Sequence, residues 1–368
     1  MSALTITELG GLKMRVQITL SSLIAVTFGK KVLLKAQAAS GRYSMVGAAI
    51  RFGFLPFLSV AFFSVGSDAQ LHTYVSALGS DSNPCTRVEP CRTFHHAVPL
   101  TDNGGDVVAL DSGEFGPVEI TKSVSLIAAP GVHAGISVVS GNAITINAGD
   151  FDTIILRGLT VNNEARENNT SRGIMFVGRG TLGVETCIVA GFPAGQGLFY
   201  EGARPGSLEV KDSIFRGNDV GIEVLNRNLT AQSTTDVISI AVIDHVLLEK
   251  NGLGLEVTDA CGVSVHNTIA SNNRDGFSMH CFGSGELNLE SCLSSNNSEF
   301  GILSFKDSSG TPMSGTPIVR VSNSTVTNNK FCGLATLGPS AVLLSRGNNT
   351  VEGNGVNTIG TIASYTAK

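Results

Sequence analysis

Five ionisable side chains recur at matching places in a repeated part of the sequence and could carry chemistry. They are Glu209, Lys211, His266, Glu290 and Arg320. Carboxylate, imidazole and amine groups can transfer protons, and carboxylate oxygens can bind a hard cation such as calcium. The same mixture of charges also occurs on ordinary solvated sheet faces, where neighbouring strands form ion pairs. The sequence leaves both interpretations open.

The elements that would position these side chains belong to an internal repeat. An asparagine follows a small residue by five positions, and a glycine and a short apolar strand come next. The repeated asparagines, including one unit with an inserted residue and a degraded last copy, are Asn218, Asn251, Asn273, Asn297, Asn329 and Asn354. One unit cannot bury its own apolar face, so the units must stack. We therefore predict an all-β fold, a parallel β-helix (solenoid) of about ten coils.

Each coil should place its side chains by strand alternation. The strand before Ser213 is expected to point Leu208 and Val210 inward and Glu209 and Lys211 outward. The repeated asparagines are expected at sharp turns in a left-handed conformation, with hydrogen bonds from coil to coil. The glycine after each of them permits backbones to approach closely.

Aligning the first strand of successive coils predicts two outward columns. The first reads Glu185, Lys211, Ile243, His266, Glu290 and Ser322, and the second reads Gly183, Glu209, Ala241, Ser264, Asn288 and Arg320. Residues at one level of neighbouring strands lie about 4.8 Å apart. Coil-to-coil variation concentrates at residues 226–236 and 306–316, which we interpret as surface loops.

The first 69 residues differ in composition from the rest. They hold seven Lys or Arg against two acidic residues, whereas residues 70–368 hold 18 basic and 28 acidic side chains. The apolar run 52–65 follows Arg51 and precedes small residues, which is typical of a secretory signal cleaved after Ala69. Met45 would then be the natural start. An uncleaved anchor is the alternative, although the run is shorter than the ~20 apolar residues that span a bilayer.

Seven cysteines fit an oxidising compartment in part. Cys85 and Cys91 are six residues apart, and we predict that they close a small disulfide loop. A zinc site there is disfavoured, because no second Cys/His pair with ligand spacing lies near. Cys187 and Cys292 occupy the small-residue slot of the repeat and are interpreted as core residues. A Cys261–Cys281 pair stays open.

Two early segments carry a family resemblance. TYVSALGSDSNPCTRVEPCRTFHHAV and GGDVVALDSGEFGPVEITKSVSLIA resemble the amino-terminal cap and first coils of secreted bacterial proteins of the pectate-lyase-like superfamily. The resemblance covers about residues 72–360. It implies a right-handed winding and a cap helix around 93–98, so the expected domains are a leader at 1–69, a cap at 70–105 and a β-helix at 106–368. Many members act on polysaccharides.

The resemblance also implies what an active site would need. Lyases of this superfamily use acidic residues to hold calcium and a Lys or Arg to take a proton. In that case Lys211 or His266 would be the base, and Glu209, Glu290 or Arg320 would handle substrate charge. No Asp cluster lies on the predicted columns, which argues against a calcium-dependent lyase. The paired and triplet aspartates and the Gly-His-Gly of the hydrolases are absent, but a carboxylate pair that the sequence does not reveal stays open, because separation cannot be read from spacing.

Other functions are disfavoured by composition. Residues 178–183 match G-x-G-x-x-G, but a strand is expected to follow where a dinucleotide site needs a helix. The acidic chain has no basic patch for nucleic acid, and no other stretch could cross a membrane once the signal is removed.

We therefore expect an exported protein, either secreted, periplasmic or at the cell surface. Without catalysis and without a cofactor, it would serve as a carbohydrate-binding or surface-interaction scaffold, with a polysaccharide or cell-surface glycan as partner. The alternative is a lyase or epimerase on uronate-containing glycans, for which calcium is a possible cofactor. The sequence does not indicate an oligomeric state.

Overall fold

The computed structural model describes residues 70–165, 170–226, 239–308 and 315–366, together with three short strands near the amino terminus. The chain divides into two units, Met1–Val65 and Gly66–Lys368. In the first unit, β1 (Leu4–Thr7) pairs antiparallel with β2 (Lys13–Val16) and β3 (Leu33–Lys35). The predicted signal at 52–65 lies outside the described residues, as do most of the predicted loops at 226–236 and 306–316. Among the described residues, no helix is long and apolar enough to cross a membrane.

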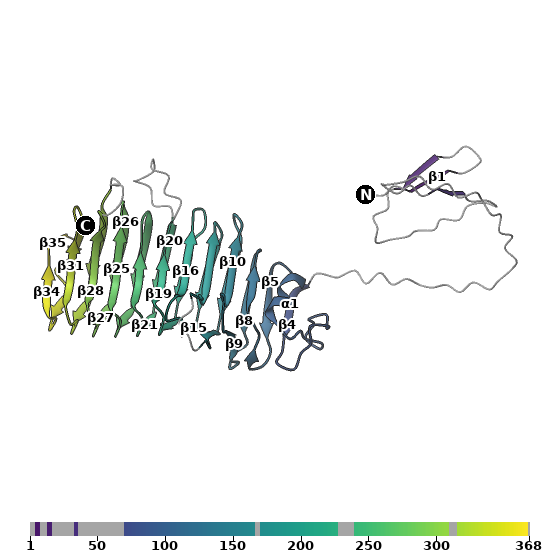
Figure 1. The fold of residues 1–368 in the computed structure, drawn as a ribbon, viewed down its shortest axis with the longest axis horizontal. Coiled ribbons are helices and arrows are strands. Elements are labelled where there is room, and N and C mark those ends of the chain that lie inside the picture. Colours follow the sequence, from purple (N-terminus) through teal and green to yellow (C-terminus); the bar gives the residue numbers. More distant parts are fainter. Residues whose placement is uncertain are drawn as a thin grey trace. The chain divides into compact units, whose positions relative to one another are not determined.

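The second unit is a stack of coils whose strands form three parallel sheets, as Figure 1 shows. Within the described residues the first sheet contains β4 (Gln70–Val75), β5 (Thr101–Ala109), β8 (Val124–Ala128), β11 (Thr153–Arg157), β14 (Thr181–Glu185), β17 (Leu208–Lys211), β20 (Ser239–Asp244), β23 (Cys261–His266), β26 (Gly285–Glu290), β29 (Pro317–Ser322), β32 (Val342–Ser345) and β35 (Ile362–Ser364).

The second sheet, again counting only described residues, contains β6 (Gly113–Glu114), β9 (Ala134–Val138), β12 (Leu159–Asn163), β15 (Ile188–Ala190), β18 (Ile214–Arg216), β21 (Leu247–Glu249), β24 (Ile269–Ser271), β27 (Leu293–Ser295), β30 (Thr325–Thr327) and β33 (Thr350–Glu352). The third sheet contains β7 (Val118–Ile120), β10 (Ile144–Ala148), β13 (Ile174–Gly178), β16 (Gln196–Gly202), β19 (Val220–Val224), β22 (Leu253–Val257), β25 (Asp275–Cys281), β28 (Phe300–Lys306), β31 (Cys332–Leu337) and β34 (Val356–Ile359). One strand from each sheet makes a coil, so the described chain forms ten coils, as the repeat predicts.

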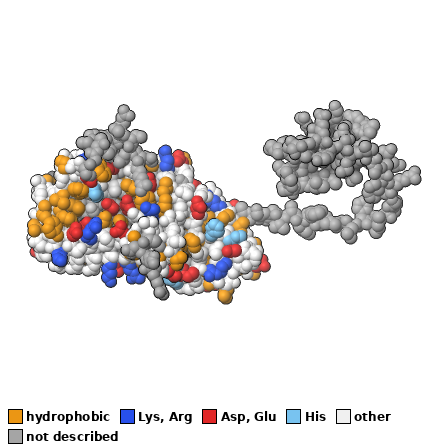
Figure 2. Space-filling view, viewed as in Figure 1, with side chains coloured by type: hydrophobic (Ala, Val, Ile, Leu, Met, Phe, Trp, Pro, Cys, Tyr) orange, Lys and Arg blue, Asp and Glu red, His pale blue; other side chains and the backbone are white. Residues whose placement is uncertain are grey.

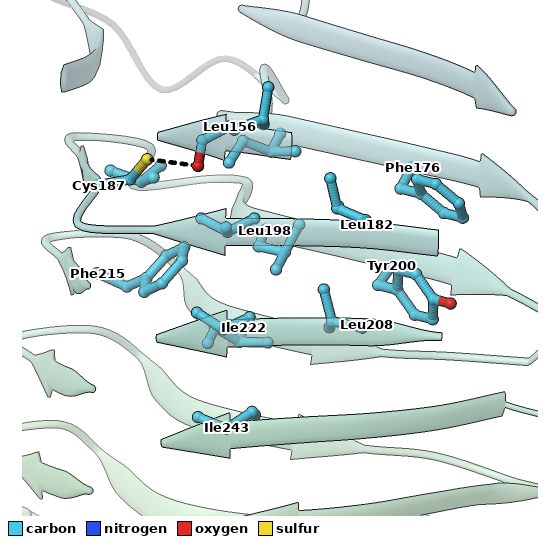
Figure 3. Packing of buried hydrophobic residues seen from close by; sticks show 14 of the residues in the cluster. Leu156, Phe176, Leu182, Cys187, Leu198, Tyr200, Leu208, Phe215, Ile222 and Ile243 are labelled. Atoms are coloured by element: carbon cyan, nitrogen blue, oxygen red, sulfur yellow. Dashed lines mark hydrogen bonds between the residues drawn. The ribbon is translucent and has the colours of Figure 1, made fainter. Parts of the chain in front are cut away.

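The core is the interior of the stack. Side chains from all three sheets point inward and stack on the equivalent residue of the next coil, as Figure 3 shows. Phe176 and Tyr200 lie on neighbouring strands with their ring centroids 4.8 Å apart. Leu208 and Val210 are buried, as strand alternation predicts. Each such apolar side chain contributes roughly 1.5–3 kcal/mol when it leaves water.

A ladder of buried asparagines joins the coils where the second sheet turns into the third. The backbone N–H and Nδ2 of Asn218 both donate to Oδ1 of Asn251, at 3.0 and 3.1 Å. The pattern repeats down to Asn354. The expected left-handed conformation of these asparagines is wrong. It belongs to the residue before, such as Lys250 (φ 56°) or Asn272 (φ 58°), because that bend turns the ladder amide inward.

A second column occupies the bend between the first and second sheets. Ser213 Oγ accepts a hydrogen bond from the backbone N–H of Cys187, and Ser324 Oγ accepts one from that of Cys292. These residues are buried, which confirms that Cys187 and Cys292 are core residues. In the coil between those of Ser213 and Thr268, Val246 occupies the position of the small residue, because its N–H donates to Thr268 Oγ1.

The position of Val246 shows that the predicted register of β20 is wrong. With Val246 in the position of Ser213, strand alternation buries Ile243 and Ala241. The strand pairing places Asp244 beside Lys211 and Val242 beside Glu209. The inserted residue assumed for this coil is therefore not in β20, and Asp244 and Val242 replace Ile243 and Ala241 in the outward columns.

The amino-terminal end of the stack is closed by α1 (Phe94–Leu100). Thr93 caps the helix by accepting a hydrogen bond from the His96 N–H at 3.2 Å. Its buried face packs Phe94 against Phe115, with ring centroids 5.3 Å apart. The cap helix expected at 93–98 is thus confirmed in place and role. Cys85 and Cys91 form the predicted disulfide in the loop before the helix.

Candidate functional site

The first-sheet face carries the five predicted residues. Pairing of successive strands places Lys211, Asp244, His266 and Glu290 at one level of neighbouring coils. Glu209 and Arg320 lie in the adjacent column. The structure therefore brings the five residues onto one face, but it places the coil of Asp244 between Lys211 and His266.

Most of these side chains form an ion pair or a hydrogen bond with a neighbouring residue. Lys211 Nζ pairs with the carboxylate of Glu209. Arg320 Nη1 donates to Glu286 Oε2 at 3.1 Å and to Asn288 Oδ1 at 3.2 Å, and Ser322 Oγ donates to Glu290.

These contacts disfavour proton abstraction on the first-sheet face. The hydrogen bond to Glu209 raises the pKa of Lys211, whereas a proton-abstracting lysine needs a lowered pKa. The carboxylates are also poorly suited to calcium, because Glu209 is paired with an amine and Glu290 accepts from a hydroxyl. The geometry favours a solvated face with ion pairs.

A different arrangement lies on the outer face of the third sheet. Each of the strands β16, β19, β22, β25, β28 and β31 pairs with the next, and this pairing aligns one outward residue from each strand. We call this set the third-sheet column, and its members are Phe199, Glu223, Glu256, Ser278, Leu303 and Ala335. Two carboxylates therefore occupy neighbouring levels, with Phe199 before them and Ser278 after them. Unlike the carboxylates, the other four members of the column are buried.

Glu256 is the most perturbed carboxylate of this face. Only 19% of its side chain is exposed. Burial, followed by the negative charge of Glu223, raises the pKa of Glu256 to about 7, and the nearby guanidinium of Arg274 opposes the shift. A carboxyl group with this pKa is a proton donor at neutral pH. Perturbed groups of this kind concentrate at functional sites.

His280 connects Glu256 to the next coil. Its Nδ1 lies 3.9 Å from Glu256 Oε1, and its Nε2 lies 3.4 Å from Asp307 Oδ2. The edge of the imidazole also meets the ring of Phe305, with centroids 4.7 Å apart. Glu256, His280 and Asp307 come from three successive coils, so the parallel stacking itself assembles them.

An apolar surface adjoins these polar groups at the carboxyl-terminal coils. Leu303, Cys332 and Ala335 are packed together outside the main core, and Phe300, Phe305, Leu337 and Ile359 lie against them. Phe331 packs edge-on against Phe300 and is half exposed. Figure 2 shows hydrophobic side chains gathered over these coils, with acidic and basic side chains next to them. At the other end of the column, Arg172 covers the ring of Phe199 at 4.5 Å.

The remaining donor group does not form a metal site. Cys85, Cys91 and His96 bring their ligand atoms within 4.8 Å of one another. Both sulfurs, however, are bonded to each other, and a disulfide has no thiolate to offer a metal. In this disulfide, Cys85 and Cys91 are not available as thiolate ligands.

Comparisons with known proteins address the fold. A family model described as the right handed beta helix region matches residues 231–356. The pectate lyase Pel9A superposes with a TM-score of 0.52 at 14% identity, covering 77% of this chain and 79% of that chain. The fold is a right-handed parallel β-helix. The resemblance to the pectate-lyase-like superfamily is confirmed at the level of that fold.

Two further solved structures are more distantly similar to this chain. The A-module of the mannuronan C-5 epimerase AlgE4 from Azotobacter vinelandii has a TM-score of 0.43 at 12% identity, covering 72% of this chain and 91% of that chain. A rhamnogalacturonan lyase has a TM-score of 0.41 at 13% identity, covering 77% and 87%. No curated protein matches the chain in sequence.

In this right-handed β-helix, sequence reasoning missed the third-sheet column. A signal was present, because Glu223 and Glu256 stand at the same place in the repeat, two residues after its glycine, in GIEV and GLEV. The outward columns predicted from the sequence contain only residues of the strand before the small residue. Glu223 and Glu256 belong to the strand after the glycine, and that strand is not part of those columns.

Proposed function

We propose that this chain is an exported polysaccharide-binding protein whose third-sheet face receives the glycan. The observation that carries the proposal is the juxtaposition on one parallel face of aromatic and apolar side chains with Glu256 and His280. Sugar rings offer apolar faces to aromatic side chains and hydroxyl groups to carboxylates. Phe305 and Phe331 are partly exposed and can contact a sugar ring, whereas Phe199 and Leu303 of the third-sheet column are buried.

Export is supported by the covalent chemistry and the sequence. A disulfide such as Cys85–Cys91 forms and persists in oxidising compartments. The apolar run 52–65 with its basic flank is typical of a secretory signal. These features favour a secreted, periplasmic or cell-surface location.

The lyase or epimerase alternative built on the first-sheet residues gains little support. Such chemistry needs a neutral base beside a neutralised uronate. Lys211 instead keeps its proton beside the Glu209 carboxylate. Charged side chains on the first-sheet face form ion pairs with one another. The proposed binding face is therefore the third sheet, and no bound calcium is required.

The experiment is a binding measurement with matched variants. The full chain is screened on an array of defined polysaccharides, and hits are measured by calorimetry. Phe305→Ala should weaken binding at least about tenfold, the equivalent of ~1.4 kcal/mol, because it removes the ring beside His280. Phe151→Ala is the matched control, since Phe151 is 82% exposed and lies outside the third sheet.

Two outcomes would contradict the proposal. The first is the absence of binding to every polysaccharide on the array. The second is equal weakening by Phe305→Ala and Phe151→Ala. Lys211→Ala tests the competing face, and loss of binding in that variant would move the site to the first sheet.

A further inference from the structure

The outer face of the second sheet carries a continuous column of aliphatic side chains. Strand pairing aligns one outward residue from each of the successive strands β15, β18, β21, β24 and β27. We call this set the second-sheet stripe, and its members are Ile188, Ile214, Leu247, Ile269 and Leu293. All five side chains are at least partly exposed, and Ile269 is 40% exposed. Neighbouring levels lie about 4.8 Å apart, so the stripe is roughly 19 Å long.

The stripe is separate from the core of the stack. The inward residues of the same strands, such as Phe215 and Leu248, are fully buried and fill the interior. On a solvated face, alternation places polar residues at the outward positions, as Glu209 and Lys211 do on the first sheet. Contacts between successive members of the stripe cover their flanks but leave their outer sides in water. A contiguous apolar surface of this kind marks an interaction site.

Opposite charges lie beside the centre of the stripe. Arg216 and Glu249 are register partners on β18 and β21, in the outward column next to the stripe. In the described part of the chain, neither side chain forms an ion pair. The equivalent positions of the strands on either side are uncharged, and they are Asn162, Ala190, Ser271, Ser295 and Thr327.

A two-fold axis parallel to the strands, placed between β18 and β21, makes this face complementary to itself. Such an axis reverses the order of the coils and keeps the direction of the strands, so each column faces its own copy. Ile214 then faces Leu247 of the second copy, and Ile188 faces Ile269. The same operation brings Arg216 opposite Glu249 of the second copy, and it does so twice.

The bends beside the stripe agree with the same axis. Asp212 and His245 are equivalent residues, each two positions before a member of the stripe, and both are exposed. The axis places Asp212 opposite His245 of the second copy, where a carboxylate can accept a hydrogen bond from an imidazole. At the other levels from β12 to β27, uncharged residues of the bend face one another, so no like charges meet.

We propose that the second-sheet stripe is a self-association interface and that its occupant is a second copy of this chain, packed antiparallel about this axis. The pairing of opposite charges under one operation favours a second copy over a membrane or an unrelated protein. Six coils of this face would bury on the order of 1,000 Å² counting both copies, which is near the lower end of stable interfaces. We therefore expect a reversible dimer with a dissociation constant in the micromolar range. The third sheet of each copy stays open, so the inference does not depend on glycan binding.

The first test compares two outward aliphatic residues of similar exposure. Sedimentation velocity of the full chain is measured over a range of concentrations. Ile269→Asp should raise the dissociation constant at least about a hundredfold, because the dimer would bury a carboxylate opposite Ile188 of the second copy. Val242→Asp is the matched control, since Val242 is 37% exposed on the first sheet, and it should leave the dissociation constant unchanged.

The second test separates contacts between chains from contacts within one chain. Arg216→Glu or Glu249→Arg alone places like charges opposite each other twice in the dimer, so each should raise the dissociation constant at least about tenfold. An equimolar mixture of the two variant chains should form a heterodimer with wild-type affinity, because each chain then meets opposite charges. That recovery also shows that both variants are folded.

Four results would overturn the proposal. They are a wild-type chain that stays monomeric at its highest soluble concentration, a trimer or larger closed assembly, equal effects of Ile269→Asp and Val242→Asp, and no heterodimer in the mixture of charge variants. A role of Arg216 and Glu249 within one chain alone predicts the last of these results.

Discussion

Asn251 donates both its backbone N–H and its side-chain Nδ2 to a single oxygen, Oδ1 of Asn273, at 2.9 and 3.1 Å. Both residues are buried. Removing the acceptor leaves the backbone N–H and one of the two Nδ2 hydrogens of Asn251 without a partner away from water, while Nδ2 keeps its other hydrogen bond, to the Phe215 carbonyl oxygen. Each such loss costs roughly 1–3 kcal/mol. Asn273→Ala should therefore lower the free energy of unfolding by about 3 kcal/mol, measured by urea denaturation.

Asn147→Ala is the control for that substitution. Asn147 is exposed and donates to Glu119 on the surface, so the change should stay within about 0.5 kcal/mol. Equal losses in the two variants would show that the ladder contributes no more than a surface amide.

Two glycines provide a second matched pair. A Cβ added at Gly254 would lie 2.4 Å from the carbonyl oxygen of Gly276, whereas one at Gly183 would have 3.8 Å to its nearest atom. Gly254→Ala should destabilise the fold by about 1–3 kcal/mol through overpacking. Gly183→Ala should stabilise it by up to about 1 kcal/mol, because the unfolded chain loses conformational freedom. The same urea measurement decides, and a tolerated Gly254→Ala would refute the close approach of the backbones.

Thiol titration checks the cysteine assignments. Cys187, Cys261, Cys281, Cys292 and Cys332 are free and buried. Burial raises the pKa of Cys187 to about 11 and that of Cys261 to about 12, so these thiols are unreactive in the native state. A thiol reagent should modify none in the native chain, five after denaturation without reductant and seven after reduction. A count of three in the unreduced denatured chain would indicate the Cys261–Cys281 pair that the sequence left open.

Glu256 gives stability a defined pH dependence. Its pKa rises from 4.5 to about 7 on folding, so the folded chain holds this proton more tightly than the unfolded chain. Stability is then highest below pH 4.5 for this group and falls as pH rises toward 7, by about 3 kcal/mol. Glu256→Gln should remove this slope and raise the melting temperature at pH 8. Glu209→Gln, whose carboxylate is half exposed, should leave the slope unchanged. A wild-type slope that persists in Glu256→Gln would assign the dependence to another group.

The framework of the fold could be predicted because its signals are local and repeated. An amide that must meet the same amide in the next coil recurs at a fixed place, as Asn273 and Asn297 do. Strand alternation alone was enough to predict that Leu208 is buried and that Glu209 points outward. The cap helix and the Cys85–Cys91 bond also followed from short-range patterns.

The site could not be predicted as readily, because alternation fails where its strands begin. Gly254 approaches the backbone of the next coil and Leu255 is also buried, so two consecutive residues face the interior before Glu256 points outward. Counting alternate residues from Gly254 would place Glu256 in the interior, whereas counting from Leu255 places it on the outside. The pairing of β20 was misjudged for a related reason, since Val246 is large for a slot that elsewhere holds Ser213 or Thr268. Distances between coils, on which the Glu223–Glu256 pair depends, are set by stacking and not by sequence spacing.

The buried ladder has an evolutionary consequence. Because the side chain and backbone N–H of Asn251 bond to the coils on either side of it, the register of each coil is held from inside and depends on its nearest neighbours. Exposed outward residues such as Glu209 or Val242 can then be exchanged without disturbing the scaffold. Binding specificity on such a solenoid can change by substitution of outward residues in one coil at a time. Whole coils from another β-helix could be grafted wherever their asparagines continue the ladder.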